Sequence, residues 1–444
     1  MNFVTAERIL TTLTSESLSR RHPGRLDRMR AFLELLGNPQ RRFRSIHVGG
    51  TAGKGSTATM IAAILHASGR KVGLHVKPHL RSVTERARID GAPVDEQTFA
   101  DLLSDMLPAV DEMEAGEWGK PSYFELIVAL AFVLFARERV DVAVVEVGIG
   151  GTLDGTNVIE PLASVITNVG MDHMDVLGDT IDQIAADKAG IIKDRVPVVT
   201  GAEAIDALRV IRARAAEHRA PLSVVNEDAR IELLPNQMAY AQTFRVTTAA
   251  GRYEAVIPLL GEFQLTNAAT AILACERVGG VLPFAAEDVG AGLAELSLPG
   301  RMEFYPARPA IVFDVAHNVE KARALRDALE RHFPRRRVTF VASIAEGKDA
   351  AGMIEAWSQL PAQFICTMFR IPHRNPTMPR VLATIAESNG MVARAVEDPI
   401  EALSVARRIA GSGEMVVVTG STYLVAELRD WFLEHAGAHG RAAV

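Results

Sequence analysis

The chain has 444 residues, 48% of them hydrophobic, and a formal net charge of −6. This length predicts two domains with substantial cores, and the negative charge without a long basic run disfavours a nucleic-acid surface. Cys275 and Cys366 lie in apolar runs outside any C-x-x-C motif, which predicts buried thiols in a reducing compartment. The N-terminus has no signal-peptide pattern and no apolar stretch is long enough to span a bilayer. We therefore expect a cytoplasmic protein without a membrane partner.

The first predicted elements lead to a glycine-rich loop. Helical periodicity runs from about residue 6 to 36, and a strand is predicted at 45–48. Gly49-Gly50-Thr51-Ala52-Gly53-Lys54-Gly55-Ser56-Thr57 follows, and then a helix at 58–65. A strand, a glycine loop and a helix form the context of a phosphate-binding loop, because backbone N–H groups and a helix N-terminus attract phosphate oxygens. Lys54 would reach the outer phosphates, and Ser56 or Thr57 would offer a hydroxyl near a metal. The alternative is a glycine turn with an incidental lysine.

Strands and helices then alternate to about residue 200. Strands are predicted at 71–76, 140–147, 163–168 and 196–200, and helices at 95–106, 126–135 and 181–189, the first of these on the surface. Residues 85–91 are predicted to form a loop with a turn, and 222–257 a small antiparallel patch. The alternation predicts a P-loop-type, doubly wound and mostly parallel sheet in an α/β domain.

Polar residues at the ends of these strands are the candidate site residues. Lys77 follows its strand at the edge where open α/β sheets bind ligands. Glu146 ends a buried strand beside glycines, which suits either a metal ligand or a capped structural acid. A lone histidine is usually structural, but His173 lies between two aspartates after a strand, which favours a ligand role.

The α/β alternation begins again after residues 298–301. Strands at 310–313, 338–343, 364–369 and 415–419 predict a smaller, Rossmann-like C-terminal α/β domain. We therefore place the domains at 1–298 and 299–444. An alanine-rich helix is expected from about residue 260 through Cys275, and the tail at 436–444 is expected to fray.

In this order and spacing the motifs resemble those of the folylpolyglutamate synthase and dihydrofolate synthase family, within the Mur ligase superfamily. The resemblance covers nearly the whole chain. It is carried by residues 26–29, 37–40, 50–56, 78–80, 85–86, 124–125, 146–148, 153–157, 172–178, 188–192, 299–301 and 314–318.

The resemblance implies ATP-dependent amide formation by a monomer. A carboxylate attacks the γ-phosphate of ATP to give an acyl phosphate and ADP, and the amine of glutamate then attacks the acyl phosphate. ATP and Mg²⁺ are the implied cofactors, and glutamate and a folate or pteroate are the implied substrates. Positioning and charge neutralisation dominate such phosphoryl transfer.

The resemblance also implies roles for individual residues. Lys54, His173 and Lys188 would be catalytic. Glu146, His173 and Lys188, which carries a carbamate in this family, would hold metal ions, and an oxygen-donor carbamate suits Mg²⁺. Because Arg301 and Asp314 lie at and beyond the predicted boundary, we expect both domains to hold ATP. The implied ATP contacts are Ala52, Gly53, Lys54, Gly55, Ser56, Asn267, Arg301, Asp314 and His317, and the implied pterin-side residues are Ser122, Tyr123, Phe124, Glu125, Leu153, Asp154 and Gly155.

The chain departs from the family at four positions. The family usually has Asn at Ala52, Arg at Thr152, His at Phe263 and Ser at Lys77, where that Ser helps to bind the first metal. A protonated lysine cannot ligate Mg²⁺. Lys77 therefore either supplies part of a cation's charge beside Glu146 and the phosphates, or points aside.

Three interpretations remain open at this point. The leading one is a ligase that adds glutamate to a pteroate or folate. The second is a related ligase that joins an amino acid to another carboxylate, such as a poly-γ-glutamate chain, and only Lys77, Ala52 and Thr152 favour it. The third is a non-enzymatic nucleotide-binding switch, which would need fewer of the residues Glu146, His173, Lys188 and Arg301.

Overall fold

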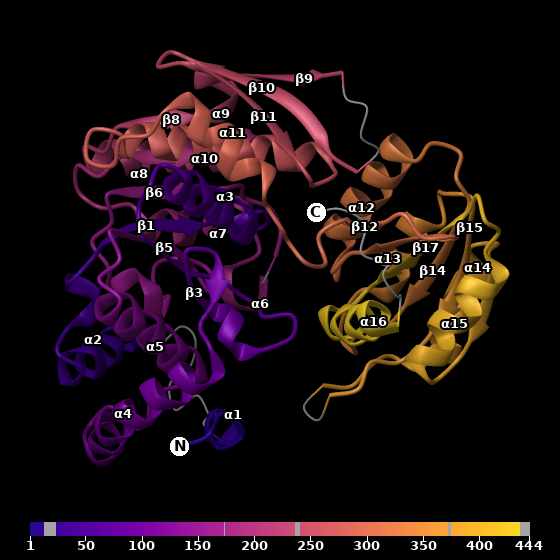
Figure 1. Cartoon of the computed structure of the whole chain (residues 1–444), viewed down its shortest axis with the longest axis horizontal. Coiled ribbons are helices and arrows are strands. Elements are labelled where there is room, and N and C mark those ends of the chain that lie inside the picture. The colour runs from indigo at the N-terminus through magenta and orange to yellow at the C-terminus, as the bar shows by residue number, and fades with distance from the viewer. Residues whose placement is uncertain (13–23, 173, 236–239, 372–373, 436–444) are drawn as a thin grey trace. The chain divides into compact units, whose positions relative to one another are not determined.

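The computed structural model describes residues 1–12, 24–172, 174–235, 240–371 and 374–435 (Figure 1). The chain divides into two compact units. The first comprises Met1–Leu234, Thr243–Val256 and Phe263–Leu296, and the second comprises Pro235–Gln242, Ile257–Glu262 and Ser297–Val444. The domain boundary expected at 298/299 stays a prediction, which expression of the separate parts would test.

The N-terminal unit is built on an eight-stranded sheet with the order β4-β3-β2-β5-β1-β6-β7-β8. Neighbouring strands from β2 to β8 are parallel, and β3 and β4 add an antiparallel edge. This arrangement confirms the predicted doubly wound, mostly parallel sheet. The strands are β1 (Arg44–Gly49), β2 (Val72–His75), β3 (Ala87–Ile89), β4 (Ala92–Pro93), β5 (Val142–Glu146), β6 (Ala163–Ile166), β7 (Val198–Thr200) and β8 (Leu222–Val224).

Helices cover both faces of this sheet, with α3 and α5 on opposite sides of β1 and β5 (Figure 1). The α5 side buries an apolar cluster that includes Phe132, Phe135 and Val145. The helices of this unit are α1 (Phe3–Thr12), α2 (Arg25–Leu35), α3 (Lys54–Ala67), α4 (Glu96–Ala115), α5 (Tyr123–Arg137), α6 (Met174–Leu177), α7 (Ile181–Lys188), α8 (Ile205–Glu217), α9 (Val225–Asp228), α10 (Glu262–Val278) and α11 (Ala286–Ala294). Short 3₁₀ turns are η1 (Pro39–Arg41), η2 (Val83–Arg86), η3 (Gly155–Val158) and η4 (Ala189–Ile191).

A second, antiparallel sheet has the order β11-β10-β9. Its strands are β9 (Ala229–Leu234), β10 (Gln242–Thr248) and β11 (Arg252–Ile257). Arg245 on β10 pairs with Glu232 on β9 at 3.0 Å and with Glu254 on β11 at 2.8 Å, so opposite charges face one another across the strands. Part of the predicted antiparallel patch at 222–257 is therefore correct, but β8 belongs to the parallel sheet.

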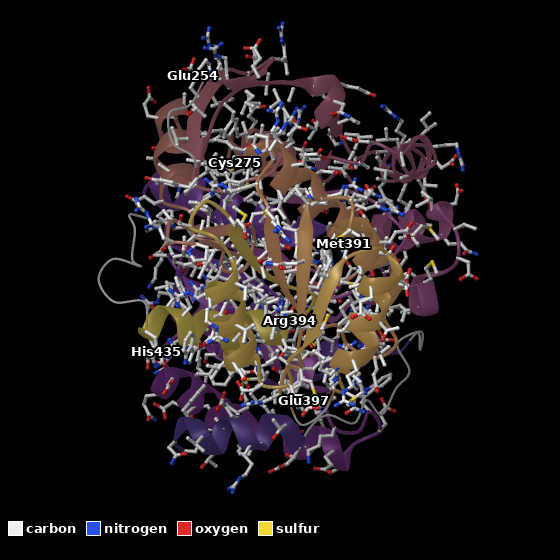
Figure 2. The ribbon with its side chains drawn as sticks, turned by 90° about the vertical axis from the view of Figure 1, so that its right-hand side faces the viewer. Glu254, Cys275, Met391, Arg394, Glu397 and His435 are labelled. Atoms are coloured by element: carbon white, nitrogen blue, oxygen red, sulfur yellow. The ribbon has the colours of Figure 1, made fainter. Side chains whose placement is uncertain are left out.

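The C-terminal unit contains a six-stranded sheet with the order β12-β13-β17-β14-β15-β16, parallel except for β12. Stacked rings of Phe340, Trp357 and Phe364 fill its core. Met391 and Glu397 lie just before and just after the edge strand β16, which carries Arg394 (Figure 2). The strands are β12 (Glu303–Tyr305), β13 (Ala310–Phe313), β14 (Val338–Ala342), β15 (Ala362–Cys366), β16 (Val392–Ala395) and β17 (Met415–Thr419), and the helices are α12 (Val319–His332), α13 (Ala350–Trp357), α14 (Pro379–Ser388), α15 (Pro399–Ile409) and α16 (Thr422–His435).

Two sequence-based expectations need correction. The periodic stretch at 6–36 is not one continuous helix, because α2 begins at Arg25 after Gly24, and the periodicity did not mark that start. Residues 85–91, expected as a loop, include β3, which pairs with β2. Helix α4 lies at the surface as expected, with Glu96, Gln97 and Asp101 exposed, and its other face buries Phe99, Leu103 and Met106 in the α5-side cluster. The tail at 436–444 lies outside the described residues.

Within the described residues, no helix is both long and apolar enough to cross a membrane. Cys275 and Cys366 are both buried free thiols, as expected.

Candidate active site

The glycine loop lies between β1 and α3 and is held from the side by the end of β6. Thr51 N donates to the carbonyl of Asn168 at 3.0 Å, and Ala52 N donates to Oδ1 of the same asparagine at 2.7 Å. Gly50 has a φ of 137°, and a Cβ there would stand 2.0 Å from Thr167 Oγ1. A side chain at this glycine is therefore excluded both by conformation and by space. Contacts with Thr167 and Asn168, which follow β6, therefore fix the shape of the loop.

Two lysines converge on this loop. Lys54 Nζ donates to the carbonyls of Gly50 at 2.8 Å and Thr51 at 3.1 Å. Lys188, at the end of α7 and 2% exposed, donates from Nζ to the same Gly50 oxygen at 3.0 Å. Two lysine side chains beside the N-terminus of a 14-residue helix make a site for a multiply charged anion.

Asn267 and the loop lie together, as the resemblance implies. A Cβ on Gly53 would stand 2.3 Å from Asn267 Oδ1, and Asn267 Nδ2 donates to Gln264 Oε1 at 2.9 Å. Gln264 is fully buried, and sequence reasoning missed it. The start of α10 therefore packs against the glycine loop.

Glu146, at the end of β5, lies against the first turn of α3. It is 3% exposed, and its Oε2 stands 3.2 Å from where a Cβ on Gly55 would be. The backbone N–H of Lys77 donates to the same Oε2 at 2.9 Å. On α3, Thr57 Oγ1 is fully buried and has no hydrogen-bond partner in the structure.

The Glu146 carboxylate suits a divalent cation that also binds phosphate. Mg²⁺ favours carboxylate and other oxygen ligands and usually completes its shell with substrate phosphates and water. No group of three or more His, Cys, Asp or Glu side chains in the described parts of the chain could hold a metal by itself. His173, the other expected metal ligand, lies outside the described residues.

The two segments expected on the pterin side do meet. A Cβ on Gly148 would stand 2.4 Å from the ring of Phe124 and 2.6 Å from Asp154 Oδ2, and Gly155 lies beside Phe124 and Glu125. The guanidinium of Arg86 lies 5.4 Å from the ring centre of Tyr123. Leu153 is partly buried in the same loop as Asp154. Phe124 and Asp154 thus flank Gly148, and Arg86 lies over the ring of Tyr123, the residue before Phe124.

Two of these residues have local structural partners. Ser122 and Glu125 form a capping box at the start of α5. The Glu125 carboxylate also forms a buried ion pair with Arg28 at 2.7 Å. Asp154 accepts hydrogen bonds from Ile149 N at 2.9 Å and from the Thr156 hydroxyl. Arg28 was missed from sequence because its partner lies 97 residues away.

Two buried histidines stand behind this region. His47 Nε2 lies 2.8 Å from Thr156 Oγ1, which in turn bonds Asp154. Burial, followed by Lys193 and His75, lowers the pKa of His47 to about 3, and burial lowers that of His75 to about 3 as well. Both imidazoles are therefore neutral at physiological pH and act as hydrogen-bonding groups.

The C-terminal unit carries the remaining expected nucleotide residues, near the carboxyl end of β13. Asp314, 9% exposed, accepts from Met302 N and Ala316 N, each at 2.9 Å, and burial raises its pKa. His317 Nδ1 donates to the Val315 carbonyl at 2.8 Å, and burial, then Lys321, lowers its pKa to about 3. Arg301 is partly buried and favours the charged form of Asp314.

Comparison with known proteins identifies the family. Residues 48–275 match the Mur ligase middle domain, and residues 300–422 match the Mur ligase, glutamate ligase domain. The dihydrofolate synthase/folylpolyglutamate synthase of Bacillus subtilis is 34% identical over 92% of this chain and 94% of its own.

Solved structures have a similar fold over almost the full length of this chain. The Mycobacterium tuberculosis folylpolyglutamate synthase complexed with ADP has a TM-score of 0.88 and 31% identity, covering 97% of this chain and 98% of that one. The E. coli FolC in complex with DHPP and ADP has a TM-score of 0.87 and 26% identity, covering 98% and 99%. Because two Mur ligase domains and a full-length relative match, this chain belongs to the folylpolyglutamate synthase and dihydrofolate synthase family of Mur ligases.

Proposed function

We propose that the protein is an ATP-dependent carboxylate–amine ligase that adds L-glutamate to a folate or dihydropteroate through an acyl phosphate. The observation that carries the proposal is the loop at 49–57, where Lys54, Lys188 and a helix N-terminus converge beside Glu146. This is the place for the triphosphate, and relatives named for this reaction cover the chain almost end to end.

The chain's own residues would act mainly by positioning and charge. The loop N–H groups and Lys54 would hold the phosphates, so that the acceptor carboxylate meets the γ-phosphate in line. Phe124, Tyr123 and Arg86 would orient the acceptor, with Asp154 beside them. Arg301, Asp314 and His317 would contribute nucleotide contacts from the C-terminal unit.

We propose Mg²⁺ as the cofactor, held by Glu146 and His173, with Ser56 or Thr57 offering a hydroxyl. The ion would neutralise phosphate charge when bound. Lys188 would serve this site as a carbamate. Its Nζ reaches the glycine loop, where a carbamate oxygen would lie near the phosphates. Intact-mass measurement at low and high bicarbonate, with Lys188→Arg as the control, tests the modification.

Product analysis tests the function. Purified protein is incubated with ATP, Mg²⁺, L-glutamate and single acceptors from a panel of pteroates, folates and poly-γ-glutamate peptides. We expect phosphate release that depends on a pteroate or folate, and a product heavier by one glutamyl residue. Turnover only with poly-γ-glutamate would instead favour the second ligase interpretation, which the comparisons do not favour. Acceptor-independent hydrolysis alone would contradict both.

We also propose that the protein acts as a monomer in the cytoplasm. Light scattering on the eluted protein and fractionation of cells test the two statements separately.

A further inference from the structure

The side-chain carboxylate of Asp154 is held by three donors of the protein. Its Oδ1 accepts from Thr156 N at 3.0 Å and from Thr156 Oγ1 at 2.5 Å, and its Oδ2 accepts from Ile149 N at 2.9 Å. A carboxylate has about four acceptor positions, two on each oxygen. Among the residues that the structure describes, these donors fill both positions on Oδ1 and one on Oδ2. The position left for a ligand therefore lies on Oδ2.

This oxygen lies beside the ring of Phe124. Asp154 Oδ2 and the ring are both within 2.6 Å of the point where a Cβ on Gly148 would stand, so the glycine leaves room for their close approach. Asp154 is 7% exposed, and water competes little for its oxygen. A carboxylate oxygen beside an aromatic ring suits a flat heterocycle that carries N–H groups.

His47 supports the carboxylate through Thr156. Because the Thr156 hydroxyl donates its one proton to Asp154, it can only accept from His47 Nε2, which lies 2.8 Å away. This fixes the Nε2–H tautomer of His47, and its Nδ1 accordingly has no proton to donate and no partner among the described residues. His47 and Thr156 are both fully buried, so the two hydrogen bonds form a chain closed to water.

The same histidine belongs to the strand that leads into the glycine loop. His47 lies on β1, two residues before Gly49, where the loop begins. One strand thus carries both the loop proposed for the triphosphate and the imidazole that supports Asp154. Two successive hydrogen bonds connect that strand to the acceptor region.

We propose that His47 and Thr156 are positioning residues for the acceptor, which hold Asp154 so that its Oδ2 receives an N–H group of the acceptor's heterocycle. The proposal rests on the proposed ligase function. Hydrogen bonds in such a buried chain polarise and strengthen one another, so each member helps to keep the carboxylate in one orientation. A purely structural role would instead lower stability and leave the acceptor affinity of the folded protein unchanged.

Binding without turnover tests the proposal. Isothermal titration calorimetry would give the Kd of AMPPCP, and then the Kd of 7,8-dihydropteroate and of tetrahydrofolate for the AMPPCP complex. The variants are Thr156→Val and His47→Leu, which remove a donor, and Thr156→Ser and His47→Gln, which keep one. Thr339→Val is the matched control, because the Thr339 hydroxyl is fully buried in the C-terminal unit, where it accepts from Gln363 at 2.8 Å.

Thr156→Val and His47→Leu should raise the acceptor Kd roughly tenfold or more, and change the AMPPCP Kd by less than about twofold. Thr156→Ser and His47→Gln should bind the acceptor nearly as the wild type does, and so should Thr339→Val. Because Thr156 acts through Asp154, adding Thr156→Val to Asp154→Ala should change the acceptor Kd by less than about twofold.

Three results would overturn the proposal: an unchanged acceptor Kd in Thr156→Val, an equal weakening of acceptor and AMPPCP, or a full effect of Thr156→Val in the Asp154→Ala background. If Thr156→Val does not fold, the comparison of His47→Leu with His47→Gln decides. A wild type that binds neither acceptor and shows no acceptor-dependent turnover would refute the proposed function, and this proposal with it. Acceptor binding and turnover by the wild type, with unchanged affinity in the donor-removing variants, would refute the positioning role alone.

Discussion

At the scale of single residues, the shared acceptor of Lys54 and Lys188 is informative. Both Nζ atoms bond the carbonyl of Gly50, at 2.8 and 3.0 Å. In the unmodified protein two ammonium groups on one oxygen repel each other, and either the anionic oxygens of a triphosphate or the carbamate proposed on Lys188 would relieve that repulsion. The unmodified loop therefore favours a negatively charged group beside the two lysines.

Lys54→Ala should remove a charge-assisted contact to the phosphates. We expect kcat/KM for acceptor-dependent phosphate release to fall by roughly 10²-fold or more, equivalent to about 2–4 kcal/mol of transition-state stabilisation. Lys71→Ala, which removes an outlying ammonium paired with Glu138, should retain near-normal turnover. Similar turnover in both variants would show that Lys54 does not contact the reacting phosphates.

His47 should make the stability of the protein depend on pH. Its pKa is lowered to about 3 from 6.5, mainly by burial, so between these values the unfolded chain binds more protons than the folded one. The contribution of His47 to the free energy of unfolding is therefore fully present above pH 6.5. It is lost as the pH falls below that value, by up to about 1.4 kcal/mol per pH unit.

The variant His47→Gln tests this directly. Glutamine keeps a terminal amide that can reach Thr156 Oγ1 but does not titrate. Urea unfolding at pH 7 and pH 5 should show a smaller loss of stability for the variant than for the wild type. If the variant lost as much stability between pH 7 and pH 5 as the wild type, His47 would protonate readily in the folded state.

At the scale of secondary-structure elements, the start of α5 is fixed by a buried charge. Glu125 accepts from Ser122 N and Oγ, each at 2.8 Å, and pairs with Arg28 of α2 at 2.7 Å. Arg28 is fully buried and Glu125 is 1% exposed. This network holds α2, α5 and Phe124 of the acceptor region in one arrangement.

Arg28→Met should lower the free energy of unfolding by about 3–5 kcal/mol, because it leaves a buried carboxylate without its partner. Adding Glu125→Gln should restore much of that loss, since the amide keeps the cap and carries no charge. Thermal unfolding measures both effects. The control Arg30→Met breaks an exposed pair with Asp27 and should change the midpoint little. A double variant as unstable as Arg28→Met would show that packing, not charge, is what Arg28 supplies.

At the scale of the whole molecule, the expected nucleotide residues are divided between two units with separate cores. Asn267 and the glycine loop belong to the N-terminal unit, and Arg301, Asp314 and His317 to the C-terminal unit. A ligand that binds only the folded protein raises the free energy of unfolding by an amount that grows with the logarithm of its concentration divided by its Kd. Thermal unfolding can therefore show whether the second group of residues takes part.

AMPPCP should raise the free energy of unfolding of the wild type by about 2.7 kcal/mol at a concentration 100 times its Kd, and so raise the unfolding midpoint. Arg301→Ala should reduce this shift if Arg301 contacts the nucleotide. Arg394→Ala, on the exposed edge strand β16 of the same unit, should leave it unchanged (Figure 2). An equal shift in all three proteins would exclude Arg301 from the nucleotide site.

The sequence by itself determined the features that depend on local pattern. Strands β13 and β17 were predicted at the residues where they occur, because a short apolar run between turns marks a buried parallel strand. The glycine loop between β1 and α3 was equally evident, since glycines, a lysine and a helix start lie within nine residues of one another. Motifs in a fixed order along the chain then indicated the family.

Only the tertiary structure decided which of these residues meet. The antiparallel pairing of β3, the burial of one face of α4 and the ion pair of Arg28 with Glu125 all join segments whose local patterns do not specify a partner. The same holds for Lys77: an alternation of strands and helices does not state which strands are neighbours. Because β2 lies beside β5 in the sheet, Lys77 and Glu146 share an edge, and the backbone N–H of Lys77 binds the Glu146 carboxylate there.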